Sequence, residues 1–437
     1  MARAKKEAPL TPEERLQAAL VPDWEWPYKL PENWCWVYAP HIFDIEYGKG
    51  LPTKQLSDTG YPVFGANGQI GFYSEYMYKE PQALMSCRGA YSGTMNKSLP
   101  YSYVTSNSLI ISSPRGLMGT DCIYYLFSAL NVSELISGTA QPQVTVQAFD
   151  GFPIPLSPLA EQQRIVDRIE SLFAKLDEAK EKAQAVVDSF ETRKAAILHK
   201  AFTGELTAKW REEHGVEMES WEKKSVGELC ISLKYGTAKK SDASGNMVVL
   251  RMGNLQQGEI DWSDLAYSND PDDIEKYKLF PGDVLFNRTN SAALVGKTAI
   301  YRGEHPAIYA GYLIKLDYDH DKIIGDYLNY ALNTLDAKKY CNSVKTDGVN
   351  QSNINAKKIG AYSFNVPSIP EQEKIVSVIQ KLLSKEQQAK EATEIVLDQI
   401  ELMKKSILAR AFRGELGTND PSEESAVELL KEIIRRG

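Results

Sequence analysis

A long duplicated segment constrains the fold of this chain more than any other feature of its sequence. When the 437 residues are compared with themselves at an offset of 210, residues 161–206 align with residues 371–416 without a gap. Twenty-one of these 46 positions are identical, including Glu161-Gln at the start and Gly204-Glu-Leu at the end. The chain therefore contains two copies of one structural unit, separated by a large intervening region.

Each copy predicts one long helix, because its apolar residues recur at alternating steps of four and three, as in a coiled coil. The expected helix-pair seam consists of Ile165, Ile169, Leu172, Leu176 and Phe190 in the first copy and Ile375, Ile379, Leu382, Ile400 and Ile407 in the second. Pro158 and Pro370 lie at the helix starts, and Gly204 and Gly414 lie where helices stop.

The two helices can pair with each other in an antiparallel coiled coil, since the connection between them is long. Glu386 and Thr393 interrupt the second seam, which could weaken the pairing or mark a surface for a partner. The 32 residues from Ile165 to Ile197 would span about 48 Å at 1.5 Å per residue, or roughly fourteen base pairs. The pair could therefore act as a ruler with a domain at each end.

A domain rich in short strands is expected before each helix. Both domains are predicted to contain a short helix near their end and to close with a Gly-x-x-Gln turn, Gly138 to Gln141 and Gly348 to Gln351. The fold class is α+β, with two mixed α/β domains separated by two long helices in a pseudo-twofold arrangement. The expected segments are 1–27, 28–155, 156–212, 213–366 and 367–437.

Composition excludes several classes of protein. The net charge is −8, so the chain does not coat nucleic acid by bulk positive charge, although local basic contacts stay possible. No run of eighteen apolar residues or secretory signal occurs, and the five cysteines are scattered. We therefore expect a cytoplasmic protein with reduced thiols, no membrane contact and no metal site.

Polar loops in both domains suit contact with DNA, because Arg, Asn and Gln read base edges and Lys reaches phosphates. The DNA-binding candidates are Arg88, Asn96, Lys97, Gln141 and Gln143 in the first domain and Lys239, Lys240, Arg288, Asn290, Lys297, Asn350, Gln351 and Asn353 in the second. The alternative for any one of them is a surface loop that merely closes a hairpin.

Motifs for catalysis are incomplete in this sequence. Gly296-Lys297-Thr298 is similar to the end of a phosphate-binding P-loop, but Ser291 stands where that loop needs glycine. Asp272 and Asp273 lack the Glu-x-Lys that would complete a nuclease pattern. The Asn-Pro-Pro-Tyr motif with which amino-methyltransferases hold a flipped base is missing as well. We therefore expect no catalytic residue.

The layout resembles the specificity subunit of a type I restriction–modification enzyme. The resemblance is carried by Pro158-Leu-Ala-Glu-Gln-Gln-Arg-Ile-Val, by Ala201-Phe-Thr-Gly-Glu-Leu, by their copies at 371–376 and 411–416, and by residues 283–298. It implies two target-recognition domains, each reading one half of a split, asymmetric site in double-stranded DNA. It also implies helices that set the spacer and bind two methyltransferase subunits, which carry S-adenosylmethionine and methylate adenine.

The same resemblance implies two motor-nuclease subunits in the restricting complex, no cofactor bound by this chain, and terminal segments that meet. Two other hypotheses stay open. A coiled-coil assembly scaffold would show no DNA preference in any complex. An enzyme with a degenerate nucleotide or metal site would gain thermal stability from nucleotide or metal.

Overall fold

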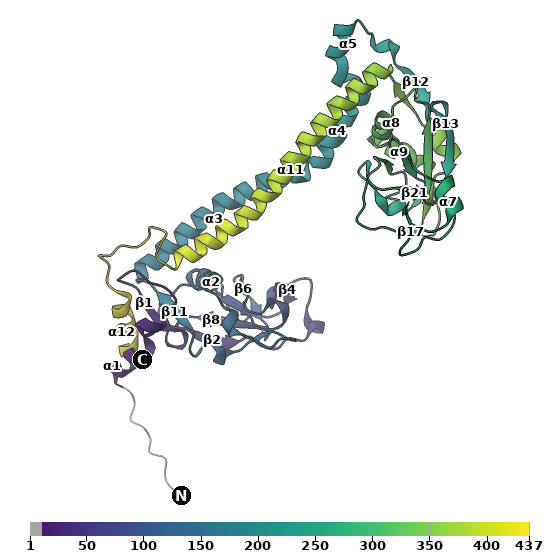
Figure 1. Cartoon of the computed structure of the whole chain (residues 1–437). Coiled ribbons are helices and arrows are strands. Elements are labelled where there is room, and N and C mark those ends of the chain that lie inside the picture. Colours follow the sequence, from purple (N-terminus) through teal and green to yellow (C-terminus); the bar gives the residue numbers. More distant parts are fainter. Residues whose placement is uncertain (1–10, 350, 437) are drawn as a thin grey trace. The chain divides into compact units, whose positions relative to one another are not determined.

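The computed structural model describes residues 11–349 and 351–436 and divides the chain into two compact units (Figure 1). Unit 1 comprises Met1–Ala183 and Ile395–Gly437, and unit 2 comprises Gln184–Glu394. Each unit contains one domain of short strands together with parts of the long helices. The predicted mixed fold with two long paired helices is confirmed.

The three long helical segments are α3 (Leu159–Asp188), α4 (Phe190–Phe202) and α11 (Ile369–Ala411). The prediction of one continuous helix was wrong for the first copy, which is divided at Ser189. There the Ser189 hydroxyl donates to the carbonyl of Ala185 at 2.7 Å, and Arg193 Nη1 donates to that of Val186 at 3.1 Å. These side chains compete for helix carbonyls, a known cause of local helix irregularity.

The helices end close to the two glycines at which the sequence predicted their ends, α4 at Phe202 and α11 at Ala411. Gly204 has φ +82° and Gly414 has φ +73°, a left-handed conformation that glycine adopts without a Cβ penalty. In unit 1, Lys180 forms an ion pair with Glu401 at 2.6 Å, so α3 and α11 lie side by side there.

The predicted seam is most deeply buried toward the helix ends. Ile165, Ile169 and Ile400 are buried in unit 1, and Phe190, Ile375 and Ile379 are buried in unit 2, whereas Leu172, Leu176, Leu382 and Ile407 are half-buried. Between these positions Ala179, Val186, Ala389 and Val396 are exposed.

Glu386 does not weaken the pairing in the way the sequence suggested. Its carboxylate accepts a hydrogen bond from Arg193 Nε at 2.6 Å, and Arg193 is itself an interruption of the first seam. The two charged residues therefore compensate each other. Thr393 donates its hydroxyl to the Ala389 carbonyl of its own helix at 2.7 Å.

In unit 1 an antiparallel four-stranded sheet has the order β2–β8–β5–β6, and a second sheet has the order β4–β3–β7. The strands are β1 (Cys35–Tyr38), β2 (Asp44–Tyr47), β3 (Tyr61–Gly65), β4 (Gly68–Tyr73), β5 (Ala83–Ser86), β6 (Met95–Lys97), β7 (Tyr103–Val104), β8 (Ser108–Ser112), β9 (Ile136–Ser137), β10 (Gln143–Val144) and β11 (Pro153–Leu156). Strand β1 pairs with β11, and β9 pairs with β10.

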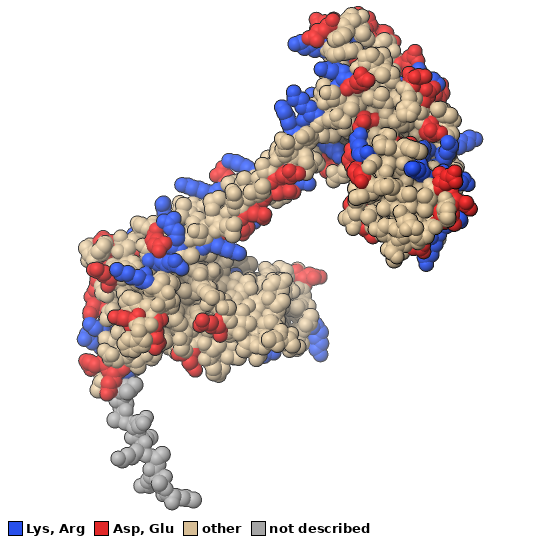
Figure 2. Space-filling model, in the orientation of Figure 1, with Lys and Arg blue, Asp and Glu red and all other residues tan. Residues whose placement is uncertain are grey.

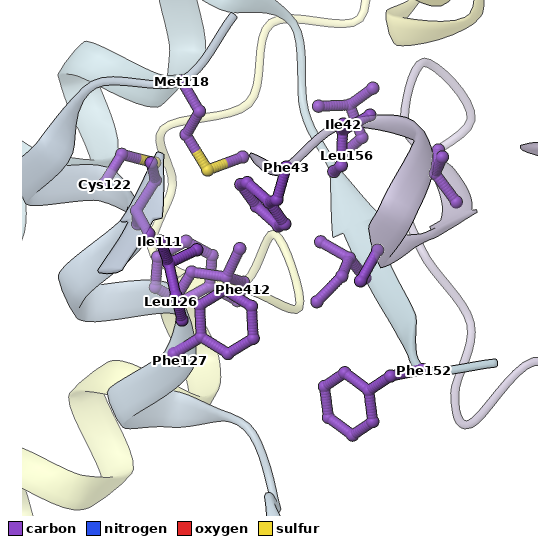
Figure 3. Packing of buried hydrophobic residues seen from close by; sticks show 14 of the residues in the cluster. Ile42, Phe43, Ile111, Met118, Cys122, Leu126, Phe127, Phe152, Leu156 and Phe412 are labelled. Atoms are coloured by element: carbon purple, nitrogen blue, oxygen red, sulfur yellow. The ribbon is translucent and has the colours of Figure 1, made fainter. Parts of the chain in front are cut away.

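The core of unit 1 joins its domain of short strands to the helix ends. Helix α2 (Thr120–Ala129) contributes Leu126 and Phe127, and Phe412 enters the same cluster from the end of the second repeat (Figure 3). Ile165 and Ile169 of α3 belong to this cluster as well. The long helices are thus rooted in the domain by burial of apolar surface, the main stabilising term in folding.

The first and last described helices meet in unit 1, in line with the terminal contact that the family resemblance implied. Helix α1 (Pro12–Ala19) begins at Thr11, whose hydroxyl accepts from Glu14 N while the Glu14 carboxylate accepts from Thr11 N. Ala19 of α1 and Leu430 of α12 (Ala426–Arg436) lie in the same buried cluster.

Unit 2 repeats the sheet order of unit 1, with β13–β22–β18–β20 in its four-stranded sheet and β17–β14–β21 in the second. Its strands are β12 (Glu222–Ser225), β13 (Cys230–Tyr235), β14 (Met247–Leu250), β15 (Leu255–Gln256), β16 (Glu259–Ile260), β17 (Tyr267–Ser268), β18 (Val284–Asn287), β19 (Thr289–Asn290), β20 (Thr298–Ile300), β21 (Ala307–Tyr309), β22 (Leu313–Tyr318), β23 (Thr346–Asp347), β24 (Ser352–Asn353) and β25 (Ser363–Val366).

Six shorter helices complete unit 2. They are α5 (Ala208–His214), α6 (Val226–Leu229), α7 (Pro271–Lys276), α8 (Gly325–Leu332), α9 (Leu335–Val344) and α10 (Ala356–Gly360). Tyr327 and Leu328 of α8 pack in one cluster with Leu198 of α4 and Ile375 of α11. The second domain therefore packs against the end of α4 and the start of α11.

Candidate nucleic-acid interface

The polar loop that follows β18 in unit 2 is held by backbone hydrogen bonds. Asn287 N donates to the Lys297 carbonyl at 2.8 Å, and Gly296 N donates to the Asn287 carbonyl at 2.9 Å. Strand β19 in this loop pairs with β24, which follows the Gly-x-x-Gln turn, and Ile354 N donates to the Arg288 carbonyl at 2.9 Å. The predicted residues on the two segments are thereby brought together.

Arg288 is half-buried and is held by one hydrogen bond and one ring contact. Its Nη1 donates to the Gly311 carbonyl at 3.2 Å, and its guanidinium carbon lies 4.8 Å from the centroid of the Tyr235 ring. Its Nε has no hydrogen-bond partner among the described residues. A guanidinium has five N–H donors, and because Nε is buried, only the remaining N–H groups of Nη1 and Nη2 could serve a base edge.

The amide side chains near Arg288 divide into supporting and exposed groups. Asn353 Nδ2 donates to Thr289 Oγ1 at 2.8 Å, and the Asn290 side-chain oxygen accepts from Ser291 N at 2.8 Å, so both stabilise the loop. Gln351 is exposed. Asn350, the remaining predicted amide, lies outside the described residues.

The predicted lysines of unit 2 differ in how free they are. Lys239 forms ion pairs with Asp270 at 2.6 Å and Asp273 at 3.5 Å, and the hydrogen bond to Asp270 raises the pKa of Lys239. A lysine between two carboxylates is a poor ligand for phosphate. Lys240 is exposed, whereas Lys297 donates to Gln256 Oε1 at 2.7 Å.

Unit 1 builds the same framework from a different sequence. Ser86 N donates to the Thr94 carbonyl, and Gly93 N donates to the Ser86 carbonyl, both at 2.9 Å. Val144 N donates to the Cys87 carbonyl at 3.1 Å, and Arg88 forms a β-bridge with Gln143. These bonds match those around Asn287, Arg288 and Gly296, and both loop glycines are left-handed, with φ +86° at Gly93 and +92° at Gly296.

Three of the predicted residues of unit 1 are exposed and lie along one edge, namely Arg88, Gln141 and Gln143. Asn96 is half-buried and donates to Ser86 Oγ at 3.4 Å. Lys97 forms an ion pair with Asp121 at 2.6 Å. Arg88 and Gln143 are therefore the best placed for base contact, whereas Asn96 supports the loop.

An exposed tyrosine cluster was missed when individual residues were chosen from the sequence. In unit 1 the ring of Tyr76 packs edge to face against those of Tyr61 and Tyr101, with centroid distances of 4.9 Å and 5.2 Å. Tyr101 has φ +54°, an unusual conformation for a non-glycine residue. The available signal was the twelve tyrosines between residues 28 and 150.

Charge is mixed on the visible surface, where Lys and Arg alternate with Asp and Glu over both units (Figure 2). Within residues 11–349 and 351–436 no group of three or more His, Cys, Asp or Glu could hold a metal ion. Among the described helices none is long and apolar enough to cross a membrane. The arrangement offers hydrogen-bond donors and acceptors on two fixed loops, which suits recognition.

Comparison with known proteins gives a consistent family. Residues 31–187 and 218–396 match the family model described as type I restriction modification DNA specificity domain. The chain is 24% identical to the type I restriction enzyme StySPI specificity subunit of Salmonella potsdam and 26% identical to the EcoKI specificity subunit of Escherichia coli. Both alignments cover 93% of this chain and 96% of the relative.

A solved structure supports the fold as well. The crystal structure of the HsdS subunit from Thermoanaerobacter tengcongensis aligns with a TM-score of 0.56 at 20% identity, covering 90% of this chain and 99% of that one. At this level of identity the likeness concerns the fold alone.

Proposed function

This chain belongs to the type I restriction–modification DNA specificity family, and from that premise we propose that its two recognition domains each read one half of a bipartite, asymmetric DNA site. The observation that carries the proposal is the shared loop framework with different side chains. By its backbone hydrogen bonds, Arg288 of unit 2 is equivalent to Cys87 of unit 1, and Thr289 of unit 2 is equivalent to Arg88 of unit 1. Two loops with the same backbone hydrogen bonds but different side chains are suited to reading two different half-sites.

We assign the role of each side chain from its exposure and from the hydrogen bonds or ion pairs that it already makes. Arg88, Gln141 and Gln143 in unit 1 and Arg288 and Gln351 in unit 2 contact base edges, because their donors are exposed or only partly used. Asn96, Asn290 and Asn353 hold the loops. Lys240 and Lys297 contact phosphates, whereas Lys97 and Lys239 contribute less because carboxylates already bind them.

The long helices set the spacer between the half-sites and dock the other subunits. The core of unit 1 includes Ala411 near the end of α11, and the core of unit 2 includes Ile375 near its start. In the proposal, the length of this helix, and not a base contact, sets the number of unread base pairs. Docking is supported by large apolar side chains that the helices leave exposed. These are Leu159, Val186, Ile395, Val396, Leu402 and Met403.

Two methyltransferase subunits carrying S-adenosylmethionine bind these helices, and two motor-nuclease subunits join them in the restricting complex. The chain itself contributes recognition and no catalytic group, in line with its relatives, which are specificity subunits.

The proposal is tested by mapping adenine methylation in cells that carry this gene with its methyltransferase partner. We expect a split motif with a fixed spacer. Arg288→Ala should relax one position of one half-site and Arg88→Ala one position of the other, each at a cost of about 1–3 kcal/mol. Lys239→Ala is the matched control, since its charge is already neutralised, and it should leave the motif intact.

An unchanged methylation map after deletion of the gene would count against a specificity role and favour an assembly scaffold. If the map depends on the gene but neither arginine variant alters the motif, the loops are not the reading surface.

A further inference from the structure

A cavity of about 500 Å³ lies beside the recognition loop of unit 2. Its walls come from α4, α9, the turn between β15 and β16, and loop residues 293–297. Three lysines from three of these segments line it, namely Lys194 of α4, Lys338 of α9 and Lys297 of the loop. The only acidic side chain among the lining residues is Glu191, one helical turn before Lys194.

Two of the three lysines donate to neutral groups. Lys297 Nζ donates to the Gln256 side-chain oxygen at 2.7 Å, and Lys194 Nζ donates to the Gln257 carbonyl at 3.4 Å. Within the described parts of the chain no carboxylate oxygen lies within 4 Å of any of the three ammonium groups. The positive charge of the cavity is therefore not balanced by an ion pair.

The electrostatics agree with this geometry. Burial lowers the pKa of Lys194, which Glu191 partly opposes and Lys338 reinforces. Burial also lowers the pKa of Lys297, and Lys338 lowers it further. The Cys341 thiol in the cavity wall stays neutral, because burial raises its pKa to about 11. Lys338 thus repels the partly desolvated ammonium groups of Lys194 and Lys297, an arrangement that an anion would relieve.

The repeat provides an internal comparison. Lys404 occupies the position of Lys194 in the second copy of the repeat, 210 residues later, and it forms an ion pair with Asp177 in unit 1. A lysine at this helix position can therefore be neutralised by a carboxylate. Lys194 lacks one, so the unbalanced charge belongs to the cavity of unit 2 and not to the helix in general.

We propose that this lysine pocket, formed by Lys194, Lys297 and Lys338, binds a phosphate group. The group is either a phosphodiester of DNA flanking the second half-site or the phosphate of a free small molecule. A doubly charged anion with several acceptor oxygens can accept from more than one of the three lysines that line the cavity, whereas one carboxylate would neutralise a single lysine. Only the DNA source rests on the proposed function; binding of free phosphate does not depend on it.

The test uses the full chain and compares Lys338→Met and Lys194→Met with the control Lys404→Met. Inorganic phosphate is titrated against each protein by calorimetry at constant ionic strength. If a free anion is the ligand, the wild-type chain and Lys404→Met bind phosphate, and both pocket variants lose at least tenfold in affinity. Lys338 is exposed, so its variant should fold even if Lys194→Met does not.

The second arm measures DNA affinity of the complex assembled with methyltransferase subunits as a function of salt. If a phosphodiester is the ligand, Lys338→Met weakens all sequences equally and reduces the slope of log K against log salt by about 1. Phosphate binding without any sequence preference would sustain the pocket while refuting the proposed function. Intact sequence preference with neither phosphate binding nor a change in salt slope would overturn the pocket.

Discussion

The buried ion pair between Arg211 and Glu371 offers a sharp test of how the second recognition domain is joined to α11. The Glu371 carboxylate is fully buried and accepts hydrogen bonds from Arg211 Nη1 at 2.7 Å, Thr207 Oγ1 at 2.7 Å and Trp221 Nε1 at 2.9 Å. The three donors come from the segment between α4 and β12. One side chain at the start of α11 therefore fastens this whole connection.

We expect Arg211→Met to destabilise unit 2 by about 3–5 kcal/mol, because removal of one partner leaves a buried carboxylate without its cation. The lower end of this range is favoured, since Thr207 and Trp221 would still donate to Glu371. Trp221→Phe removes one hydrogen bond to a charged acceptor and should cost about 1.5–3 kcal/mol.

The repeat again supplies the control. Glu161, at the position equivalent to Glu371, is also fully buried and accepts from Trp34 Nε1 at 2.7 Å, Asn419 Nδ2 at 2.9 Å and Thr418 Oγ1 at 3.1 Å. Its three donors are all uncharged. Trp34→Phe should therefore cost about as much in unit 1 as Trp221→Phe does in unit 2, about 1.5–3 kcal/mol.

Hydrogen–deuterium exchange of the full chain, followed peptide by peptide in urea, reports the opening free energy of each unit separately. Arg211→Met should accelerate exchange in β12 and α11 near Glu371 and leave unit 1 unchanged. A loss below about 1 kcal/mol, with Trp221→Phe behaving as expected, would refute the argument that Glu371 is a buried charge that needs its cation.

Three further predictions follow from other contacts. Reversing either charge of the Arg193–Glu386 pair should lower the urea midpoint of the chain, and the double swap should recover about 0.5–1 kcal/mol of the loss in a double-mutant cycle. Gly296→Ala should cost about 1–3 kcal/mol by the same assay, because the residue has φ +92° and its new Cβ would lie 2.9 Å from Cys341 Sγ. Burial raises the pKa of the Cys122 thiol to about 12 and that of Cys341 to about 11, so stability is full below the ordinary value of 9.0 and should fall as pH rises above it. A flat alkaline stability profile would contradict this last expectation.

The helices were predictable because their signal is local and duplicated. The heptad steps give the helical period, and Gly204 and Gly414 mark the ends by a conformation that only glycine adopts easily. The break at Ser189 was not predictable in the same way. It depends on two side chains competing for carbonyls one turn earlier, and the pattern of apolar residues does not register that competition.

Contacts between segments far apart in the sequence could not be predicted for a different reason. In the sequence, Arg193 and Glu386 are charged residues that interrupt the apolar seams of their two helices. The ion pair between them depends on the antiparallel register of these helices. The donors around Glu161 lie 127 residues before it and more than 250 residues after it, so no local pattern links them. Such complementarity becomes visible once the chain ends are brought together.

The recognition loops show why the two domains diverged in sequence while keeping one frame. The bonds that the two loops share are backbone to backbone, and any residue except proline can donate in them, so Ser86 and Asn287 serve equally well. The positions with left-handed φ, Gly89 and Gly93 in unit 1 and Gly296 in unit 2, favour glycine. The other side chains of each loop can change without loss of the shared backbone hydrogen bonds. In the proposed function, these are the positions where a change of sequence would alter the DNA that is read while the fold stays intact.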